Sequence, residues 1–451
     1  MSKNYDVIII GAGPCGIFSA YRLTEKNPNL KILLLEKGSD LNTRKEKHDI
    51  IYGFGGAGAF SDGKYNITTE FGGFIHNYLG LDRSYELMEE VDKINALYGG
   101  DKAAMYDQTY PEIEREALKT DLHLLKAKIR HLGTDLNFSI LTSLYEHLNK
   151  LIDIHFEEEV TDISYVNEMY EVVTEKDTYT APYTIIGVGR SGSKWLNGVC
   201  EKLEIPQLRN KVDLGVRVEI PAVIAEDIDA KIYEPKLMYR TKKYGDIVRT
   251  FCWNPCGEVV EEQVNDIKTV NGHSYHDPEK RTKNTNFALL VSNHFTSPFN
   301  NSVEYGEHIA RLSNMLGDGI IVQRLGDLRK GRRTNEHRLA QSFLQPTLKN
   351  ATPGDLSLVL PKRHLDNILE MIDALDGMFK GINNDSTLLY GVEVKFFNSL
   401  VDVDNNFMCK NYKGMFIIGD GSAITHGLSQ ASASGLHVAN TILDFIEKEN
   451  K

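Results

Sequence analysis

The chain has 451 residues, 41% of them hydrophobic and 25% charged, and its formal net charge at pH 7 is −12. This length suits two domains better than one, and no apolar run approaches the roughly 18 residues of a membrane span. The acidic balance opposes general binding to nucleic acid or to anionic membranes. Five cysteines without an export signal favour a reducing cytoplasm over a disulfide framework. The sequence therefore predicts a cytoplasmic globular protein.

A nucleotide-binding motif opens the chain. Val7–Ile10 is an apolar, β-branched run typical of a strand buried on both faces. Three glycines follow it in G-x-G-x-x-G spacing before a predicted helix, namely Gly11, Gly13 and Gly16. The first permits a tight turn, the second lets the backbone approach a pyrophosphate at the helix N-terminus, and the third lets helix and strand pack closely. A second apolar run ends in Glu36, where a carboxylate can hold ribose hydroxyls. We predict a dinucleotide site rather than a turn without a ligand.

The end of the chain indicates which dinucleotide. Residues 414–418 predict a strand that runs into Gly419-Asp420, and His426 precedes a helix of small residues that begins at Leu428. An aspartate at the end of a late strand can hold a ribityl chain. A helix N-terminus can face the negative charge that develops at flavin N1/O2 on reduction. A domain that binds only NAD needs no such return of the chain, so the sequence predicts FAD.

A second glycine-rich segment spans residues 52–64, Y-G-F-G-G-A-G-A-F-S-D-G-K. Its backbone can be approached by a flat ring, and its N–H groups can point inward. Because Phe54, Ala57 and Phe60 are interleaved with the glycines, a flexible surface loop is disfavoured. We expect the segment to lie over the pyrophosphate and the isoalloxazine ring.

These motifs resemble those of the glutathione-reductase-like FAD flavoproteins, whose fold opens with G-x-G-x-x-G and closes with a strand and Gly-Asp. G-G-A-G-x-F-S-D-G-K and G-D-G-S-A-I-T-H-G-L-S-Q-A are similar to the signature of a set of bacterial FAD-dependent dehydrogenases, or NAD(P)/FAD-dependent oxidoreductases, mostly of unassigned substrate. The resemblance implies an α/β fold. A Rossmann-like FAD-binding domain, made of a parallel sheet and a three-stranded meander, would carry an inserted mixed α+β substrate domain.

The predicted contacts with FAD come from several stretches of the chain. They are Gly11, Gly13, Pro14, Cys15, Gly16, Glu36, Lys37, Gly55, Gly56, Gly58, Ser61, Asp62, Gly63, Lys64, Val160, Gly187, Gly189, Gly419, Asp420, Gly427, Leu428 and Ser429.

The domain plan assigns residues 1–75, 151–210 and 391–451 to the FAD-binding domain, 76–150 to a helical insertion and 211–390 to the substrate domain. Periodicity predicts helices at 84–97, 141–151 and 365–379, and strands at 121–132, 183–186, 247–252 and 287–292. Residues 152–180 predict the meander, with Ile154–Phe156 as its first strand. The return to the FAD-binding domain is expected at 391–394.

Residues 187–192 form a second G-x-G-x-x-G after a strand. No strand ending in a carboxylate follows at the distance that a separate NAD site needs, so we favour a turn close to the adenine side of FAD. Aromatic hydroxylases of related fold carry an Asp-Gly near this position, where this chain has Arg190-Ser191. The resemblance therefore disfavours a monooxygenase.

The candidates for chemistry are a cysteine, a histidine and three arginines. Cys252 and Cys256, with His273 and His276 downstream, fit no common zinc module or redox disulfide; Cys252 either lines the substrate cavity or is a plain buried cysteine. His426 can donate to flavin N1/O2 or pass a proton to substrate, or it is merely packed.

The stretch 324–338 is strongly basic. Arg329, Arg332 and Arg333 form either a clamp for a substrate carboxylate or phosphate or a solvated loop paired with neighbouring acids.

The sequence thus predicts an FAD-dependent oxidoreductase, a dehydrogenase or an ene-type reductase. It would transfer a hydride between flavin N5 and a small organic substrate, an anionic one if the arginines reach it. NADH or NADPH is a candidate electron donor. Two alternatives stay open: a tRNA-modifying flavoprotein, which the charge of −12 opposes, and a flavoprotein whose FAD is structural. We predict no metal, nucleic-acid or membrane partner, and leave the direction of the reaction and the oligomeric state open.

Overall fold

The computed structural model describes residues 3–47, 49–107, 110–208, 211–232, 234–264, 266–275, 278–293, 295, 298–299, 301–396 and 400–449. The chain forms two compact units. Unit 1 comprises Met1–Gln108, Ala127–Leu208 and Asn398–Lys451, and unit 2 comprises Thr109–Lys126 and Arg209–Phe397. Among the described residues, no helix combines the length and the apolar character needed to cross a membrane.

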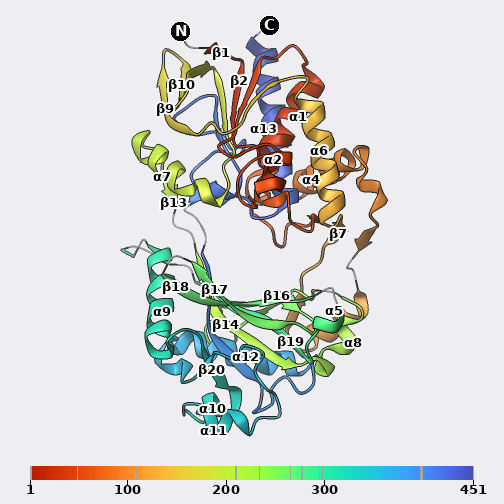
Figure 1. Cartoon of the computed structure of the whole chain (residues 1–451), viewed down its shortest axis with the longest axis vertical. Coiled ribbons are helices and arrows are strands. Elements are labelled where there is room, and N and C mark those ends of the chain that lie inside the picture. The colour runs from red at the N-terminus through yellow and green to blue at the C-terminus, as the bar shows by residue number, and fades with distance from the viewer. Residues whose placement is uncertain are drawn as a thin grey trace. The chain divides into compact units, whose positions relative to one another are not determined.

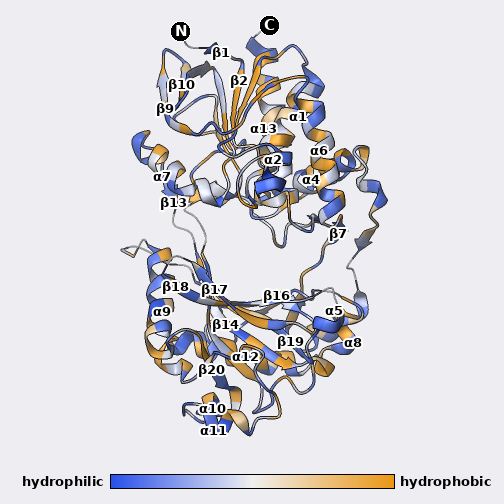
Figure 2. Ribbon diagram, in the orientation of Figure 1, coloured by the Kyte–Doolittle hydropathy of each residue, from blue (hydrophilic) through white to orange (hydrophobic). Residues whose placement is uncertain are grey.

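Unit 1 is built on a five-stranded parallel sheet with the order β24-β12-β2-β3-β8. Its central strand, β2, is labelled in Figure 1. Its strands are β2 (Val7–Ile10), β3 (Ile32–Leu35), β8 (Asp153–His155), β12 (Tyr183–Ile186) and β24 (Met415–Ile417). Every residue of β2, β3, β12 and β24 is buried, and Figure 2 shows β2 in the orange of hydrophobic residues. Apolar runs of this kind are typical of parallel sheets covered on both faces. The α/β fold predicted from the sequence is confirmed.

The first and last helices of unit 1 pack directly on each other. They are α1 (Pro14–Lys26) and α13 (Leu428–Glu449). The Ser19 hydroxyl donates to the carbonyl oxygen of Gly435 at 3.1 Å, and a Cβ on Gly435 would lie 2.2 Å from the carbonyl oxygen of Cys15. Gly435, near the end of the predicted run of small residues, therefore serves the close approach of α1.

The remaining helices of unit 1 are α2 (Leu41–Lys47), α3 (His76–Leu79), α4 (Leu81–Leu97), α6 (Thr134–Leu148) and α7 (Ser193–Lys202). Its smaller sheets contain β4 (Lys64–Ile67), β5 (Met105–Asp107), β7 (Lys128–His131), β13 (Gln207–Leu208) and β23 (Leu400–Val401).

The predicted three-stranded meander is present, but its first strand is formed by other residues than predicted. It consists of the antiparallel strands β9 (Val160–Val166), β10 (Met169–Thr174) and β11 (Thr178–Ala181), and β1 (Lys3–Asn4) joins β11 in parallel. Ile154–Phe156, expected as its first strand, lies instead at β8, on the edge of the parallel sheet. An edge strand is half exposed, so its residues alternate in polarity just as those of a meander do.

The predicted strand at 121–132 is two strands in different units. Leu122–Leu124 (β6) ends the sheet of unit 2, whereas β7 pairs with β4 and β5 in unit 1. The segment planned as a helical insertion therefore contributes to both units, because the chain passes from one to the other within it.

Unit 2 contains an eight-stranded sheet with the order β21-β20-β22-β14-β19-β16-β15-β6. Besides β6, its strands are β14 (Val212–Pro221), β15 (Leu237–Arg240), β16 (Ile247–Asn254), β19 (Asn284–Asn293), β20 (Ile321–Arg324), β21 (Thr352–Pro353) and β22 (Leu388–Phe396). A hairpin of β17 (Glu258–Val264) and β18 (Ile267–His273) accompanies it, together with helices α5 (Pro111–Leu118), α8 (Glu226–Asp229), α9 (Ser302–Gly317), α10 (Leu325–Arg329), α11 (Glu336–Ala340) and α12 (Lys362–Asp376). Residues 391–394, expected to begin the return to unit 1, lie instead inside β22, which is paired on both sides.

A half-buried carboxyl in unit 2 gives a testable pH dependence. Burial raises the pKa of Asp229 to about 6, although Trp253 Nε1 donates to its carboxylate at 2.7 Å. Because this folded pKa lies above the ordinary 3.8, the native state holds the proton more tightly than the unfolded chain does. The stability that Asp229 contributes is therefore complete below about pH 4 and is lost as the pH rises through about 6.

We expect Asp229→Asn to gain stability relative to the parent between pH 4 and pH 7, by about 1–2 kcal/mol after allowance for solvent screening. Urea unfolding followed by the fluorescence of Trp253, in a Trp195→Phe background, measures this difference. A constant difference between the two proteins across this pH range would contradict the assignment.

Candidate cofactor-binding site

A cavity of about 610 Å³ lies in unit 1, within the usual size range of ligand sites. Eighteen of the predicted cofactor residues line it: Gly11, Gly13, Pro14, Cys15, Glu36, Lys37, Gly56, Gly58, Ser61, Asp62, Lys64, Val160, Gly187, Gly189, Gly419, Asp420, Gly427 and Leu428. Gly16, Gly55, Gly63 and Ser429 were predicted as well but are not among its lining residues. The motifs at the two ends of the sequence therefore meet at one cavity.

The glycines of the first motif have different roles. Gly11 has a φ of +102°, and a Cβ there would lie 2.7 Å from the carbonyl oxygen of Gly187. A Cβ on Gly16 would lie 2.0 Å from the carbonyl oxygen of Gly11. Gly13, the N-cap of α1, has no heavy atom within 4 Å of its Cβ position, although it lines the cavity. Gly11 and Gly16 thus shape the turn, and Gly13 leaves space at a helix N-terminus, as a bound pyrophosphate requires.

Glu36 joins three loops beside this turn. Its carboxylate accepts hydrogen bonds from the backbone N–H groups of Ala12 at 2.8 Å, Gly38 at 2.8 Å and Gly53 at 3.0 Å. An ionised carboxylate has about four acceptor positions, so one position is left for a ribose hydroxyl. The sequence did not predict that the Glu36 side chain links these three loops.

Arg44, which is fully buried, anchors the glycine-rich segment through hydrogen bonds to its backbone. The guanidinium donates to the carbonyl oxygens of Phe54 at 2.5 Å and of Gly56 at 3.0 Å. Asn137 Nδ2 donates to the carbonyl oxygen of Gly58 at 2.9 Å. These bonds hold the segment with Gly56 and Gly58 on the cavity wall. Nothing in the sequence marked Arg44, one basic residue in a polar stretch.

The second glycine motif packs on the first. The Cys15 thiol donates to the carbonyl oxygen of Gly187 at 3.3 Å, and Gly189 has no heavy atom within 4 Å of its Cβ position. Gly187 and Gly189 line the same cavity as Gly11 and Gly13. This arrangement favours the prediction that the second motif serves the same nucleotide.

Asp420, just beyond β24, forms the centre of a charged group on the cavity wall. One carboxylate oxygen contacts His426 Nδ1 at 2.8 Å, and the other accepts from Arg190 Nε at 2.8 Å. Burial by itself raises the pKa of Asp420, but the hydrogen bond from His426 and the positive Arg190 together lower it. All three residues line the cavity. Because Asp420 stays ionised, it accepts a proton-bearing Nδ1 and fixes the tautomer of the neutral His426 ring, with the lone pair on Nε2.

The other predicted chemical residues lie in unit 2. Cys252 is a free, partly exposed cysteine with a φ of +47°. Its carbonyl oxygen accepts from Arg217 Nη1 at 3.1 Å. No group of three or more potential metal ligands occurs within the described part of the chain; His276 lies outside that part.

The basic stretch is engaged within unit 2. Arg329 Nη2 donates to Asp373 at 2.6 Å, and Arg332 Nε donates to Asp327 at 2.8 Å. Arg333 makes a long contact of 3.5 Å with the carbonyl oxygen of Pro353. These contacts match the alternative reading of a loop paired with neighbouring acids, so we do not retain the substrate clamp.

Comparison with known families supports this site. Residues 212–396 match a family described as FAD-dependent protein, C-terminal domain-like, and residues 2–41 match the Thi4 family. The second match contains the first glycine motif and Glu36. The nucleotide-binding fold, the cavity and the match across unit 2 together define an FAD-dependent oxidoreductase, a flavoprotein enzyme.

Two individual proteins also show similarity to this chain. A protein of Clostridium beijerinckii, described as an uncharacterized protein, is 26% identical over 97% of this chain and 80% of its own length. The thiamine thiazole synthase of Phaeosphaeria nodorum is 58% identical over 33 residues, which are 7% of this chain and 10% of that enzyme.

Solved structures with a similar course of the chain include glycine oxidase from Geobacillus kaustophilus, with a TM-score of 0.41 and 12% identity, covering 98% of this chain and 95% of that one. L-proline dehydrogenase from P. horikoshii has a TM-score of 0.41 and 12% identity, covering 99% and 95%. These scores are too low to inform the function.

Proposed function

We propose that this protein transfers a hydride between FAD and a small organic substrate, and that its FAD-binding domain is of the glutathione-reductase-like kind. The observation that carries the proposal is the meeting of Gly13, Gly189 and the Asp420–His426 pair at one cavity. When bound, FAD supplies a two-electron hydride acceptor or donor at N5. NADH or NADPH is the proposed external donor.

The proposed role of the chain's own residues is to bind and orient the FAD. Gly13 admits the pyrophosphate at the N-terminus of α1, where the helix dipole favours negative charge. Glu36 holds the adenosine ribose with its remaining acceptor position. The Asp420–Arg190 pair would hold the pyrophosphate or the ribityl chain, and the glycine-rich segment that Arg44 supports would cover the ring.

His426 is the proposed proton-transfer residue. Its Nδ1 proton is directed to Asp420, so the neutral ring presents Nε2 as a proton acceptor and the charged ring presents it as a donor. Asp420 is a positioning residue for this role, since it acts through His426.

Anaerobic stopped-flow spectroscopy of the purified yellow protein tests the function. We expect NADH or NADPH to bleach the oxidised flavin band, and one compound of a metabolite panel either to reduce the flavin or to reoxidise it. With that compound, His426→Gln should retain FAD but slow the proton-coupled step by roughly 10²–10⁴-fold. His308→Gln, on helix α9 of unit 2, is the control. Flavin that responds to dithionite but to no nucleotide or metabolite would indicate a structural FAD.

A further inference from the structure

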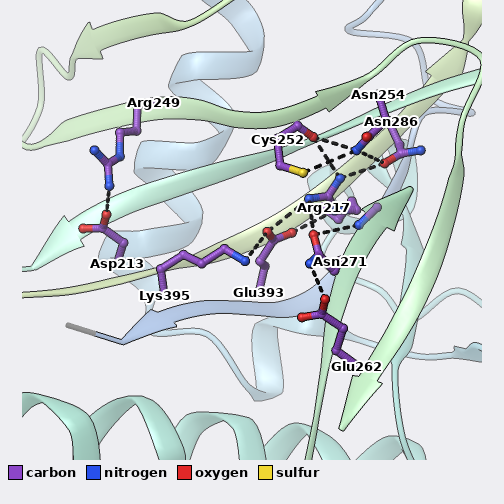
Figure 3. A network of polar contacts seen from close by, with 11 residues as sticks. Asp213, Arg217, Arg249, Cys252, Asn254, Glu262, Asn271, Asn286, Glu393 and Lys395 are labelled. Carbon is purple, nitrogen blue, oxygen red and sulfur yellow. Dashed lines mark hydrogen bonds and ion pairs between the residues drawn. The ribbon is translucent and has the colours of Figure 1, made fainter. Parts of the chain in front are cut away.

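Arg217 of unit 2 is a buried donor group that serves the fold (Figure 3). Its guanidinium donates to both oxygens of Glu393, at 2.8 and 3.1 Å. It also donates to Asn286 at 2.7 Å, to Asn271 at 3.1 Å and to the carbonyl oxygen of Cys252 at 3.1 Å. A guanidinium has five N–H donors, so the protein itself supplies an acceptor for each of them. Such a donor has no capacity left for a ligand.

Trp195 in helix α7 is a donor of the opposite kind. Its side chain lines the cavity of unit 1 together with Gly189 and Asp420. Nε1 is buried, yet it makes no hydrogen bond to any residue that the structure describes. The second tryptophan of the chain, Trp253, donates from Nε1 to Asp229 at 2.7 Å. Because a buried indole N–H usually has such a partner, the acceptor for Trp195 is to be sought in a ligand of the cavity.

A second polar group of the cavity wall is in the same situation. Thr425 is fully buried and lines the cavity, and its hydroxyl has no hydrogen-bond partner within the described part of the chain. A hydroxyl can either donate or accept, whereas an indole N–H can only donate. Trp195 therefore sets the sharper condition, since the group that satisfies it has to be an acceptor.

The position of Trp195 points to one part of the FAD. The residue lies in the first turn of α7, directly after the second glycine motif, and this helix lies against the turn Asp420–Ser422. Arg190 and Asp420 form the ion pair that we assign to the pyrophosphate or the ribityl chain. The acceptors in that part of the cofactor are phosphate and hydroxyl oxygens, which suit an N–H donor.

We propose that Trp195 is a cofactor-binding residue whose indole Nε1–H donates to an oxygen of the phosphate and ribityl chain of FAD. This inference deepens the proposed function and rests on its placement of FAD in the cavity. The cofactor contacts predicted from the sequence did not include Trp195, because a single tryptophan after a glycine motif carries no nucleotide-binding pattern of its own.

NMR of the indole N–H groups tests the contact without any turnover. The full chain, isotope-labelled at its tryptophans, should give one indole signal from Trp195 and one from Trp253, and Trp195→Phe identifies them. When FAD is added to the apoprotein, we expect the Trp195 signal to move downfield and its hydrogen exchange with solvent to slow by roughly tenfold or more. The Trp253 signal should stay in place, because its acceptor is Asp229.

Replacing the indole nitrogen with sulfur tests the hydrogen bond itself. Benzothienylalanine at position 195 keeps the size and shape of the ring but cannot donate. We expect the affinity of this apoprotein variant for FAD to fall by roughly 3- to 30-fold. Thr184→Val is the control, because the buried Thr184 hydroxyl also lacks a partner among the described residues but does not line the cavity. Its FAD affinity should equal that of the parent.

The outcomes separate this contact from the proposed function. A Trp195 signal that FAD leaves unchanged at full occupancy would overturn the contact, as would equal FAD affinities of the parent and the benzothienylalanine variant. Either result leaves hydride transfer standing if a nucleotide or metabolite still reduces or reoxidises the flavin. A Trp195 signal that responds to FAD, together with a weakened variant, in a protein whose flavin responds only to dithionite would keep the contact and reject hydride transfer.

Discussion

Replacing Glu393 with glutamine is expected to destabilise unit 2 by about 3–5 kcal/mol, the usual cost of removing one partner of a buried ion pair. Arg217 and Glu393 are both fully buried. Burial lowers the pKa of Arg217, but the facing carboxylate outweighs it and raises that pKa. The substitution therefore leaves a charged guanidinium without its counterion and with fewer acceptors. Arg217 Nη2 also donates to Asn271 of β18 at 3.1 Å, so a shift of the guanidinium after the substitution would weaken the attachment of the hairpin as well.

A double variant provides the control. Arg217→Met combined with Glu393→Leu removes both charges, and such replacements of buried pairs are often neutral or stabilising. The chain has two tryptophans, one in each unit, so Trp253 in a Trp195→Phe background reports urea unfolding of unit 2 alone. A loss below about 1 kcal/mol for Glu393→Gln would show that water or relaxation compensates the charge.

Local patterns predicted unit 1 well. The apolar runs at β2 and β12 and the glycine spacings are short-range features, and each was located correctly because a few adjacent residues determine it. The meeting of Arg190 with Asp420 was not predictable in this way, since the residues are 230 positions apart. Arg190 attracted attention only as a departure from the hydroxylase pattern, whereas the structure gives it a partner on the cavity wall.

Unit 2 was predicted less well, for a physical reason. The antiparallel order of its strands depends on distant pairings, such as that of β14 with β22, which leave no mark on sequence spacing. Charge clustering along the chain left two readings of the arginines near 330 open, and only the folded structure shows that groups such as Asp373 and Asp327 engage them.

The largest effect on cofactor binding is expected from Gly13→Ala. The backbone of Gly13 has φ −76° and ψ −178°, a conformation that alanine adopts without strain, and no atom lies within 4 Å of the new methyl group. The fold should therefore be unaffected, while the methyl group occupies the approach of the pyrophosphate. Overpacking of this kind costs about 1–3 kcal/mol, so FAD affinity should fall by roughly 5- to 150-fold.

Two further glycines make the test specific. Gly198→Ala, in helix α7, also places its methyl group in open space but does not line the cavity, so it should keep full flavin. Gly16→Ala would bring a Cβ to within 2.0 Å of the carbonyl oxygen of Gly11, and should lower the thermal stability of the apoprotein itself. The ratio of flavin to protein absorbance after purification, a titration of apoprotein with FAD, and the apoprotein melting temperature separate these cases. An unchanged FAD affinity in the titration of Gly13→Ala apoprotein would mean that the turn does not hold the pyrophosphate, since the methyl group would then meet no phosphate.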